Sequence, residues 1–219
     1  MTAPQIQAVI FDMDGILIDS EPVWQIAEHR VMQSLGLPIG FDDALQTTGL
    51  RIDQVVGYWY QRFPWEKYDN AAVAKAIVDS VVSHIERHGA PMEGVMEALE
   101  YCRASGLRIG LATSSSHALV DAVLGKLQIG DYFDAVESAQ DLAYGKPHPE
   151  VYLNCAHALG ITPTSCLAIE DSFNGLIAAR AANMQTLVIP AASQRHQAQW
   201  VIAHNQADNL LALPGLLAR

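Results

Sequence analysis

Four of the acidic side chains lie in two short segments of the chain, at positions where they could form one site. Asp12 and Asp14 come directly after one apolar run, and Glu170 and Asp171 come at the end of another. Four carboxylates held together repel one another unless some of them bind protons or a cation lies among them. Oxygen ligands suit Mg²⁺, which keeps several waters and commonly binds the phosphate group of a substrate. The pattern therefore predicts a magnesium site.

A lysine and a hydroxyl-rich segment would complement this acidic group. Lys146 lies in the sequence Gly-Lys-Pro-His-Pro, and Thr113 and Ser114 follow a third apolar run. A metal ion, a lysine and a group of hydroxyls together make a site for a phosphoryl group, because each can stabilise negative charge on its oxygens.

Each of these segments also has an ordinary structural explanation. Asp14 and the glycine after it can form a turn, and the segment 113–116 can cap a helix. Lys146 precedes a proline and can be a solvated loop residue. Glu170 and Asp171 can complement the dipole of a following helix. If all four segments were only structural, their reactive side chains would have come to follow strand ends independently, by coincidence. The sequence therefore favours one common site.

The elements expected around these residues are strands that alternate with helices. Such alternation is typical of an α/β fold with a doubly wound, Rossmann-like parallel sheet, in which ligands bind outside the carboxyl ends of the strands. Apolar runs predict buried strands at 8–11, 107–112, 166–169 and 186–189, and 133–136 is a candidate fifth strand. Helical patterns include 94–105, 118–127, 150–159 and 174–182.

The stretch between the first two predicted strands is too long for a single crossover connection. It is helical in pattern from Pro22 to about His88 and contains no convincing strand. We therefore expect an inserted α-helical cap subdomain at 18–89, carried by a core that consists of 1–17 and 90–219.

Composition excludes several classes of protein. The chain has 13 Lys and Arg residues against 24 Asp and Glu residues, a net charge of −11 that disfavours nucleic-acid binding. No apolar run reaches the roughly 18 residues of a membrane span, and the N-terminus lacks the basic region of a secretory signal. The three cysteines are far apart and form no metal-binding pair. We expect a soluble, cytoplasmic monomer without a nucleic-acid or membrane partner.

Four motifs resemble, in their usual order, those of the haloacid dehalogenase (HAD) superfamily. They are Asp12-Met13-Asp14-Gly15, Thr113, Lys146 and Glu170-Asp171. The resemblance covers nearly the whole predicted core, and the helical insert is similar to the cap of that superfamily. It implies a magnesium-dependent phosphatase, since the dehalogenases themselves lack the second aspartate.

The resemblance also implies a catalytic role for each motif residue. Asp12 would be the nucleophile that forms an aspartyl-phosphate. Asp14 would be the general acid toward the leaving group and then the base for water. Thr113 and the backbone amide of Ser114 would hold phosphate oxygens, and Lys146 would balance charge between the nucleophile and the phosphoryl group.

The implied metal ligands belong to the first and last motifs. The carboxylates of Asp12 and Asp171 and the backbone carbonyl of Asp14 would bind Mg²⁺, with Glu170 bound directly or through water. The sequence does not decide between these two modes for Glu170.

Three residues of the predicted cap and its hinge are candidates for substrate binding. Glu21 and Trp24 lie where the chain enters the cap, and Arg51 follows a Thr-Gly turn, where it could bind sugar hydroxyls or phosphate. The alternatives are a packing role for Trp24 and an exposed position for Arg51.

Within the superfamily, the chain resembles bacterial phosphatases of carbohydrate metabolism. Their substrates would be hexose 6-phosphates, 2-deoxyglucose 6-phosphate or hexitol phosphates. β-Phosphoglucomutase is one alternative, although it carries a histidine where this chain has Trp24. Phosphoglycolate phosphatase and a non-catalytic protein that binds phosphate ligands are the others. The segments that carry this resemblance are 11–22, 49–53 and 169–175.

Overall fold

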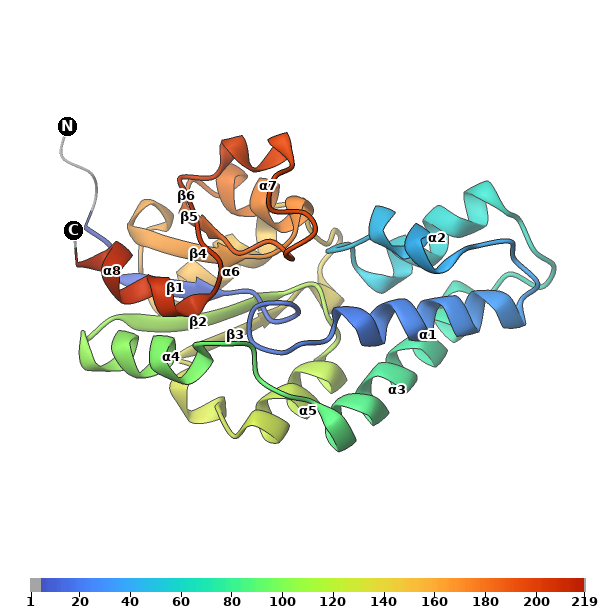
Figure 1. Cartoon of the computed structure of the whole chain (residues 1–219), viewed down its shortest axis with the longest axis horizontal. Coiled ribbons are helices and arrows are strands. Elements are labelled where there is room, and N and C mark those ends of the chain that lie inside the picture. Colours follow the sequence, from blue (N-terminus) through green and yellow to red (C-terminus); the bar gives the residue numbers. More distant parts are fainter. Residues whose placement is uncertain (1–4, 219) are drawn as a thin grey trace.

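The computed structural model describes residues 5–218 and contains a six-stranded parallel sheet with helices on both faces (Figure 1). The strand order is β3-β2-β1-β4-β5-β6, and every neighbouring pair is parallel. This confirms the predicted doubly wound α/β fold. The strands are β1 (Ala8–Phe11), β2 (Arg108–Thr113), β3 (Ala135–Ser138), β4 (Cys166–Glu170), β5 (Gln185–Val188) and β6 (Asn205–Gln206).

The central strand β1 is buried on both faces of the sheet. Successive side chains of a strand point to opposite faces. Val9 and Phe11 accordingly share an apolar cluster with α4 and α5, and Ala8 and Ile10 share another with α6 and α7. This arrangement explains the unbroken apolar run before Asp12. The helices are α4 (Val95–Ala104), α5 (His117–Leu127), α6 (Glu150–Leu159), α7 (Phe173–Ala181) and the short α8 (Leu213–Leu217), which packs beside α4.

The segment between β1 and α4 is helical and lies beyond one end of the sheet (Figure 1). It consists of α1 (Glu21–Ser34), a short 3₁₀ helix (Phe41–Gln46), α2 (Ile52–Arg62) and α3 (Asn70–His88). Helix α3 packs against α1 and α2, and also against α5 of the core.

The two points where the chain leaves and rejoins the core are paired with each other. The backbone amide of Met92 donates to the carbonyl of Leu17 at 3.1 Å, and the amide of Asp19 donates to the carbonyl of Ala90 at 3.2 Å. We propose, in line with the sequence prediction, that 18–89 is a cap inserted into the core at this junction.

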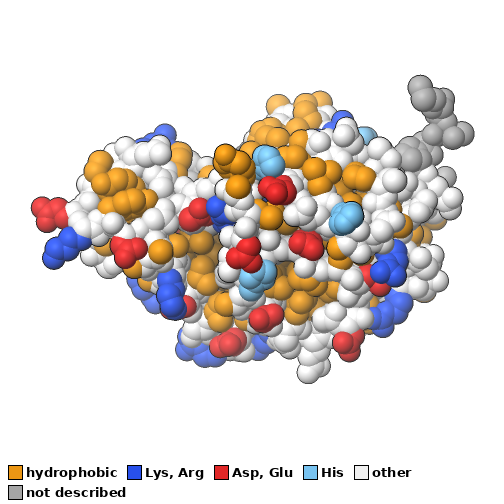
Figure 2. Space-filling view, turned by 180° about the vertical axis from the view of Figure 1, so that it is seen from behind, with side chains coloured by type: hydrophobic (Ala, Val, Ile, Leu, Met, Phe, Trp, Pro, Cys, Tyr) orange, Lys and Arg blue, Asp and Glu red, His pale blue; other side chains and the backbone are white. Residues whose placement is uncertain are grey.

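The surface carries charges of both signs. On the face shown in Figure 2, Lys and Arg side chains lie singly among Asp and Glu side chains, with small apolar areas between them. Among residues 5–218, the structure contains no helix that is both long and apolar enough to cross a membrane.

Candidate active site

The carboxyl ends of the three central strands bring the predicted site residues to one edge of the sheet. Phe11 is level with Leu111 on one side and with Ile169 on the other. The next residue along β1 is Asp12, so its carboxylate lies beside the ends of β2 and β4. The end of β4 carries Glu170. The register of the sheet therefore places Asp12 at the centre of the edge.

Lys146 connects the acidic residues of neighbouring strands. Its side chain is 2 % exposed, and its Nζ lies 2.7 Å from Asp12 Oδ1 and 2.6 Å from Glu170 Oε1. It also donates to the carbonyl of Ala112 at 2.9 Å. Burial alone would lower the pKa of Lys146, but the charges of Asp12 and Glu170 hold this pKa above its usual value. The lysine therefore keeps its proton and remains a fixed positive charge.

The carboxylate of Glu170 is held on both of its oxygens. Tyr152 OH donates to Oε1 at 2.5 Å, in addition to Lys146, and Ser172 Oγ donates to Oε2 at 3.2 Å. Gly175 packs against the same carboxylate so closely that a Cβ atom there would collide with it. Glu170 is therefore fixed in one orientation.

Three carboxylates gather close enough to hold one metal ion. Oxygens of Asp12, Glu170 and Asp171 all lie within 4.8 Å of one another. Burial, partly opposed by Lys146, raises the pKa of Asp12 to about 7, and burial with the neighbouring carboxylates raises the pKa of Asp171 well above its usual value. A divalent cation would remove this repulsion. An all-oxygen, strongly acidic set of donors fits such a cation.

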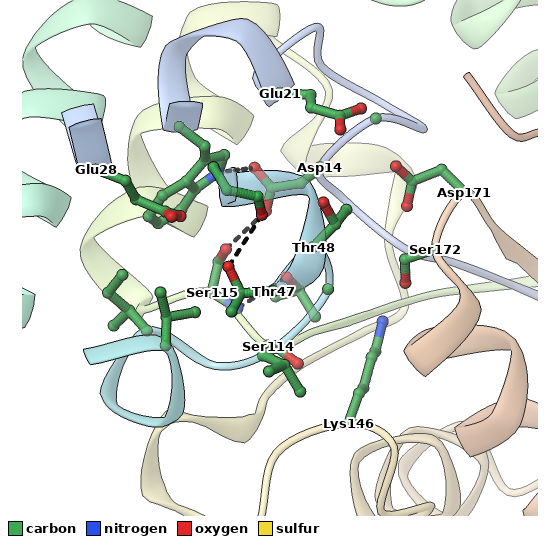
Figure 3. A pocket seen from close by; sticks show the side chains of 18 of the residues that line it. Asp14, Glu21, Glu28, Thr47, Thr48, Ser114, Ser115, Lys146, Asp171 and Ser172 are labelled. Carbon is green, nitrogen blue, oxygen red and sulfur yellow. Dashed lines mark hydrogen bonds between the residues drawn. The ribbon is translucent and has the colours of Figure 1, made fainter. Parts of the chain in front are cut away.

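The carboxylate of Asp14 accepts three side-chain hydrogen bonds. Ser20 Oγ and Trp24 Nε1 donate to Oδ1 at 2.5 Å and 2.8 Å. Ser115 Oγ donates to Oδ2 at 2.6 Å (Figure 3). The donors come from the start of α1 and from the loop after β2. Trp24 thus touches a predicted catalytic residue and also lines the pocket.

The loop between β2 and α5 offers donors for an anion. Thr113 is buried and lines the pocket, and its Oγ1 accepts from the amide of Ser115 at 3.0 Å. The hydroxyl of Ser114 lines the same pocket and is buried without a hydrogen-bond partner among the described residues. Because a buried hydroxyl is normally paired, Ser114 is suited to bind an oxygen of a ligand near the start of α5.

The pocket lies between the strand ends and the helical segment, and its empty space is about 800 Å³ with the open mouth included. Asp12, Asp14, Thr113, Lys146 and Asp171 line it from the core side. The helical segment contributes a larger and more apolar wall. Its lining residues are Glu21, Trp24, Gln25, Glu28, Ala44, Thr47, Thr48, Gly49, Leu50, Ile52, Val55 and Val78.

Two of the three predicted substrate residues of the cap, Glu21 and Trp24, are among these, but Arg51 is not. The guanidinium of Arg51 is paired with Asp53 at 2.6 Å, and its Nη1 donates to the carbonyls of Ala139 and Leu142 at 2.7 Å and 2.6 Å. We therefore do not retain a substrate contact for Arg51. Its side chain instead connects α2 to a loop of the core.

Sequence reasoning missed several residues at the site. Ser20 and Ser115, which donate to Asp14, and Ser172, which donates to Glu170, were not among the predicted site residues. Tyr152, which lies on α6, contacts Glu170 from beneath the pocket, and nothing in its local sequence indicates this. Gln25 lies four residues after Glu21, and Glu28 lies four residues after Trp24, so each is one turn beyond a predicted position on the same side of α1. The helical period of 3.6 residues was a signal that could have found them.

Strand β1 of the parallel sheet ends at the buried carboxylate of Asp12, which lies beside a buried lysine and two further carboxylates. This arrangement is that of a metal-dependent hydrolase of the α/β class. The model of the haloacid dehalogenase-like hydrolases matches residues 6–183. The chain belongs to this family, whose members use a divalent metal.

Similar proteins agree with this assignment. Hexitol phosphatase B of Escherichia coli (strain K12) is 44 % identical over 213 residues, which cover 97 % of this chain and 96 % of the relative. Among solved structures, CbbY from Rhodobacter sphaeroides in complex with phosphate superposes with a TM-score of 0.85 at 23 % identity, covering 95 % of this chain and 96 % of that one. β-Phosphoglucomutase from Clostridium difficile gives a TM-score of 0.83 at 24 % identity, covering 95 % and 93 %. Both structures show the same fold.

Proposed function

We propose that this chain is a Mg²⁺-dependent phosphatase that hydrolyses phosphomonoesters of sugars and sugar alcohols. The observation that carries the reaction is the buried Asp12 carboxylate, 2.7 Å from Lys146 and two residues before Asp14. The substrate class is supported by the likeness, over nearly the full chain, to a hexitol phosphatase. Hexitol phosphates, hexose 6-phosphates and 2-deoxyglucose 6-phosphate are the candidate substrates.

In the first step of the proposed mechanism, an Asp12 oxygen attacks phosphorus. A bond between that oxygen and phosphorus forms, while the bond to the ester oxygen of the substrate breaks. Asp14 gives its proton to the leaving alkoxide. Thr113 and Ser114 hold the phosphate oxygens, and the positive charge of Lys146 offsets the charge that collects beside Asp12.

In the second step, water attacks phosphorus and frees Asp12. Asp14, now deprotonated, takes the proton of this water, and the bond between phosphorus and Asp12 breaks to release inorganic phosphate. The hydrogen bonds from Trp24 and Ser115 keep the Asp14 carboxylate in place for both transfers.

For the metal, we propose Mg²⁺ bound by the carboxylates of Asp12 and Asp171 and by the backbone carbonyl of Asp14. When bound, it would neutralise charge on the phosphoryl oxygens. Both oxygens of Glu170 already accept hydrogen bonds from protein groups. This favours contact between Glu170 and the metal through water.

Hydrolysis of p-nitrophenyl phosphate tests the reaction. We expect activity that requires Mg²⁺ and that Asp12→Asn abolishes. For Asp14→Asn we expect slow turnover with phosphate binding retained. Activity that survives Asp12→Asn would overturn the covalent mechanism, and a protein inactive under all these conditions would point to a non-catalytic phosphate-binding role.

A panel of phosphoesters tests the substrate class. We expect hexitol and hexose phosphates to give the highest kcat/KM. Phosphoglycolate at the top of the ranking would favour a phosphoglycolate phosphatase, and interconversion of glucose phosphates without phosphate release would favour a mutase. We also propose that the enzyme works as a cytoplasmic monomer without a nucleic-acid or membrane partner, which size-exclusion chromatography and cell fractionation test.

A further inference from the structure

Glu28 is a buried acidic residue that the proposed mechanism does not use. It lies on α1 and lines the pocket, yet only 9 % of its surface is exposed. Its Oε2 atom is buried and has no hydrogen-bond partner among the described residues. Burial raises the pKa of Glu28 to about 8, and no neighbouring charge contributes to this shift. Since buried polar groups are normally paired, the missing partner of Glu28 is a group that the pocket receives.

The position of Glu28 indicates which part of a substrate would reach it. Trp24 donates to Asp14, and Glu28 follows one turn later on α1, about 6 Å farther along the helix axis at 1.5 Å per residue. In Figure 3, Lys146 and Asp171 lie on one side of Asp14 and Glu28 on the other. A phosphate bound at the strand ends would place its ester oxygen near Asp14. The rest of the leaving group would then extend along α1 toward Glu28.

The charge of the pocket limits the chemistry at this far end. Within the described part of the chain, Lys146 is the one basic side chain among the lining residues, and it lies at the phosphate end. Glu28 lines the other side. A second phosphate or a carboxylate on the leaving group would find no cation there, and above pH 8, where Glu28 is charged, it would also be repelled by that side chain. A neutral hydroxyl would find a partner.

We propose that Glu28 is a specificity-determining residue, which binds a distal hydroxyl of an uncharged polyol leaving group and disfavours esters that carry a second anionic group. This inference rests on the proposed phosphatase activity and narrows its substrates. It disfavours phosphoglycolate, whose leaving group is an acid, and sugar bisphosphates. The substrate class is the monophosphates of neutral sugars and sugar alcohols.

Two substrates of the same chain length test the proposal. A hexitol 6-phosphate ends in a hydroxymethyl group, whereas 6-phosphogluconate ends in a carboxylate at the same position. p-Nitrophenyl phosphate, which has no hydroxyl on its leaving group, reports the chemistry alone. The measured quantity is kcat/KM for the three esters in the wild-type enzyme and in Glu28→Met, Glu28→Gln and Glu97→Met. Glu97 lies exposed on α4 and serves as the matched control.

We expect the wild-type enzyme to prefer the hexitol ester over 6-phosphogluconate. Glu28→Met should lower kcat/KM for the hexitol ester roughly 10- to 100-fold, the effect of a lost hydrogen bond to a charged or buried acid. It should lower kcat/KM for p-nitrophenyl phosphate far less, because that leaving group has no hydroxyl for Glu28 to bind. Glu28→Gln keeps a hydrogen-bonding group but cannot become charged. At pH 9, where Glu28 of the wild-type enzyme is charged, the variant should keep kcat/KM for the hexitol ester and raise kcat/KM for 6-phosphogluconate relative to it about tenfold or more. Glu97→Met should change none of these values.

Different results separate the failure of this inference from failure of the proposed function. If the wild-type enzyme hydrolyses p-nitrophenyl phosphate but no neutral polyol phosphate, the proposed substrate class fails and this inference fails with it. If the wild-type enzyme prefers the hexitol ester and both Glu28 variants share that preference, only the role of Glu28 is overturned. A parallel loss on all three esters would show a structural role instead.

Thermal unfolding provides a readout that does not depend on turnover. A residue kept for binding and left unpaired in the fold should be replaceable without loss of stability, so the midpoint of unfolding should stay equal or rise in Glu28→Gln. A lower midpoint would show that Glu28 supports the fold and would overturn the proposal. Because Gln is close in shape to Glu, this variant decides the question even if Glu28→Met does not fold.

Discussion

Replacing Glu28 by glutamine should make the stability of the protein less dependent on pH. The pKa of Glu28 is about 8 in the folded protein, against 4.5 for an unburied glutamate, and burial is the cause. Between these values the folded state binds more protons than the unfolded state, so the wild-type protein loses stability as the pH rises from 4.5 to 8. At about 1.4 kcal/mol per pKa unit, the loss is about 3 kcal/mol at pH 7 and about 5 kcal/mol above pH 8.

Denaturant unfolding of both proteins at pH 5, 7 and 9, at constant ionic strength, measures this difference. We expect Glu28→Gln and the wild type to differ little at pH 5, where Glu28 is protonated and both side chains are uncharged. At pH 7 the variant should be more stable by about 3 kcal/mol, or roughly 6–12 °C in the midpoint of thermal unfolding for a chain of this size. Taking the difference between the free energies of unfolding of the two proteins removes the contribution of other titrating groups, including Asp12.

The control is Glu97→Gln, which makes the same substitution at an exposed position of α4 and should match the wild type at all three pH values. A difference between Glu28→Gln and the wild type that is the same at all three pH values would refute the reasoning. Such a result would mean that water or a protein group stabilises the charged form of Glu28 in the folded state.

Three further predictions concern the catalytic groups. Trp24→Phe removes the donor that lies 2.8 Å from Asp14 Oδ1. If the lost hydrogen bond stabilises the transition state by about 1.4 kcal/mol, kcat on p-nitrophenyl phosphate should fall tenfold with little change in KM. An unchanged kcat would show that Asp14 does not need this contact. Lys146→Met leaves Asp12 and Glu170 without their cation, so turnover should be lost. The free energy of unfolding at pH 7 without Mg²⁺ should fall by about 3–5 kcal/mol. Equal stability of variant and wild type would contradict the ion pairs of Lys146 with Asp12 and Glu170. Gly175→Ala forces the Glu170 carboxylate to move and should raise the Mg²⁺ concentration that gives half-maximal activity. The control is Gly125→Ala, whose added Cβ meets no atom within 4 Å and should leave that concentration unchanged. Equal Mg²⁺ dependence in the two variants would contradict the role of Glu170 near the metal.

The strands of the core could be predicted because their signal is local. Apolar runs at 8–11 and 166–169 match β1 and β4 to within one residue, and 107–112 and 186–189 match β2 and β5 equally well. The candidate strand at 133–136 lies two residues before β3, whose exposed edge position weakens its apolar pattern. The sequence did not indicate β6, because its two residues are exposed and polar and are defined by backbone pairing to β5.

The core side of the site could be predicted for the same reason, since residues that follow parallel strands lie together at the carboxyl ends of those strands. The cap side could not. Which residues of α1 and α2 face the pocket depends on how the helices dock over the core, and this docking is decided by contacts far apart in the sequence. Arg51 has the chemistry of a substrate ligand but meets carbonyls at 139 and 142 instead. Glu28 has the pattern of an ordinary polar helix residue, yet it is buried.

The paired backbone at 17–19 and 90–92 has a consequence for how such proteins diversify. Because the ends of the helical insert lie side by side, mutations, deletions or exchanges within it leave every strand of the sheet in register. In the proposed mechanism the nucleophile, the lysine and the metal ligands belong to the core, whereas the insert supplies the contacts to the leaving group and, through Trp24, one hydrogen bond to Asp14. On this proposal, a change of substrate needs changes around positions such as Glu28, while Asp12, Trp24 and their partners stay as they are.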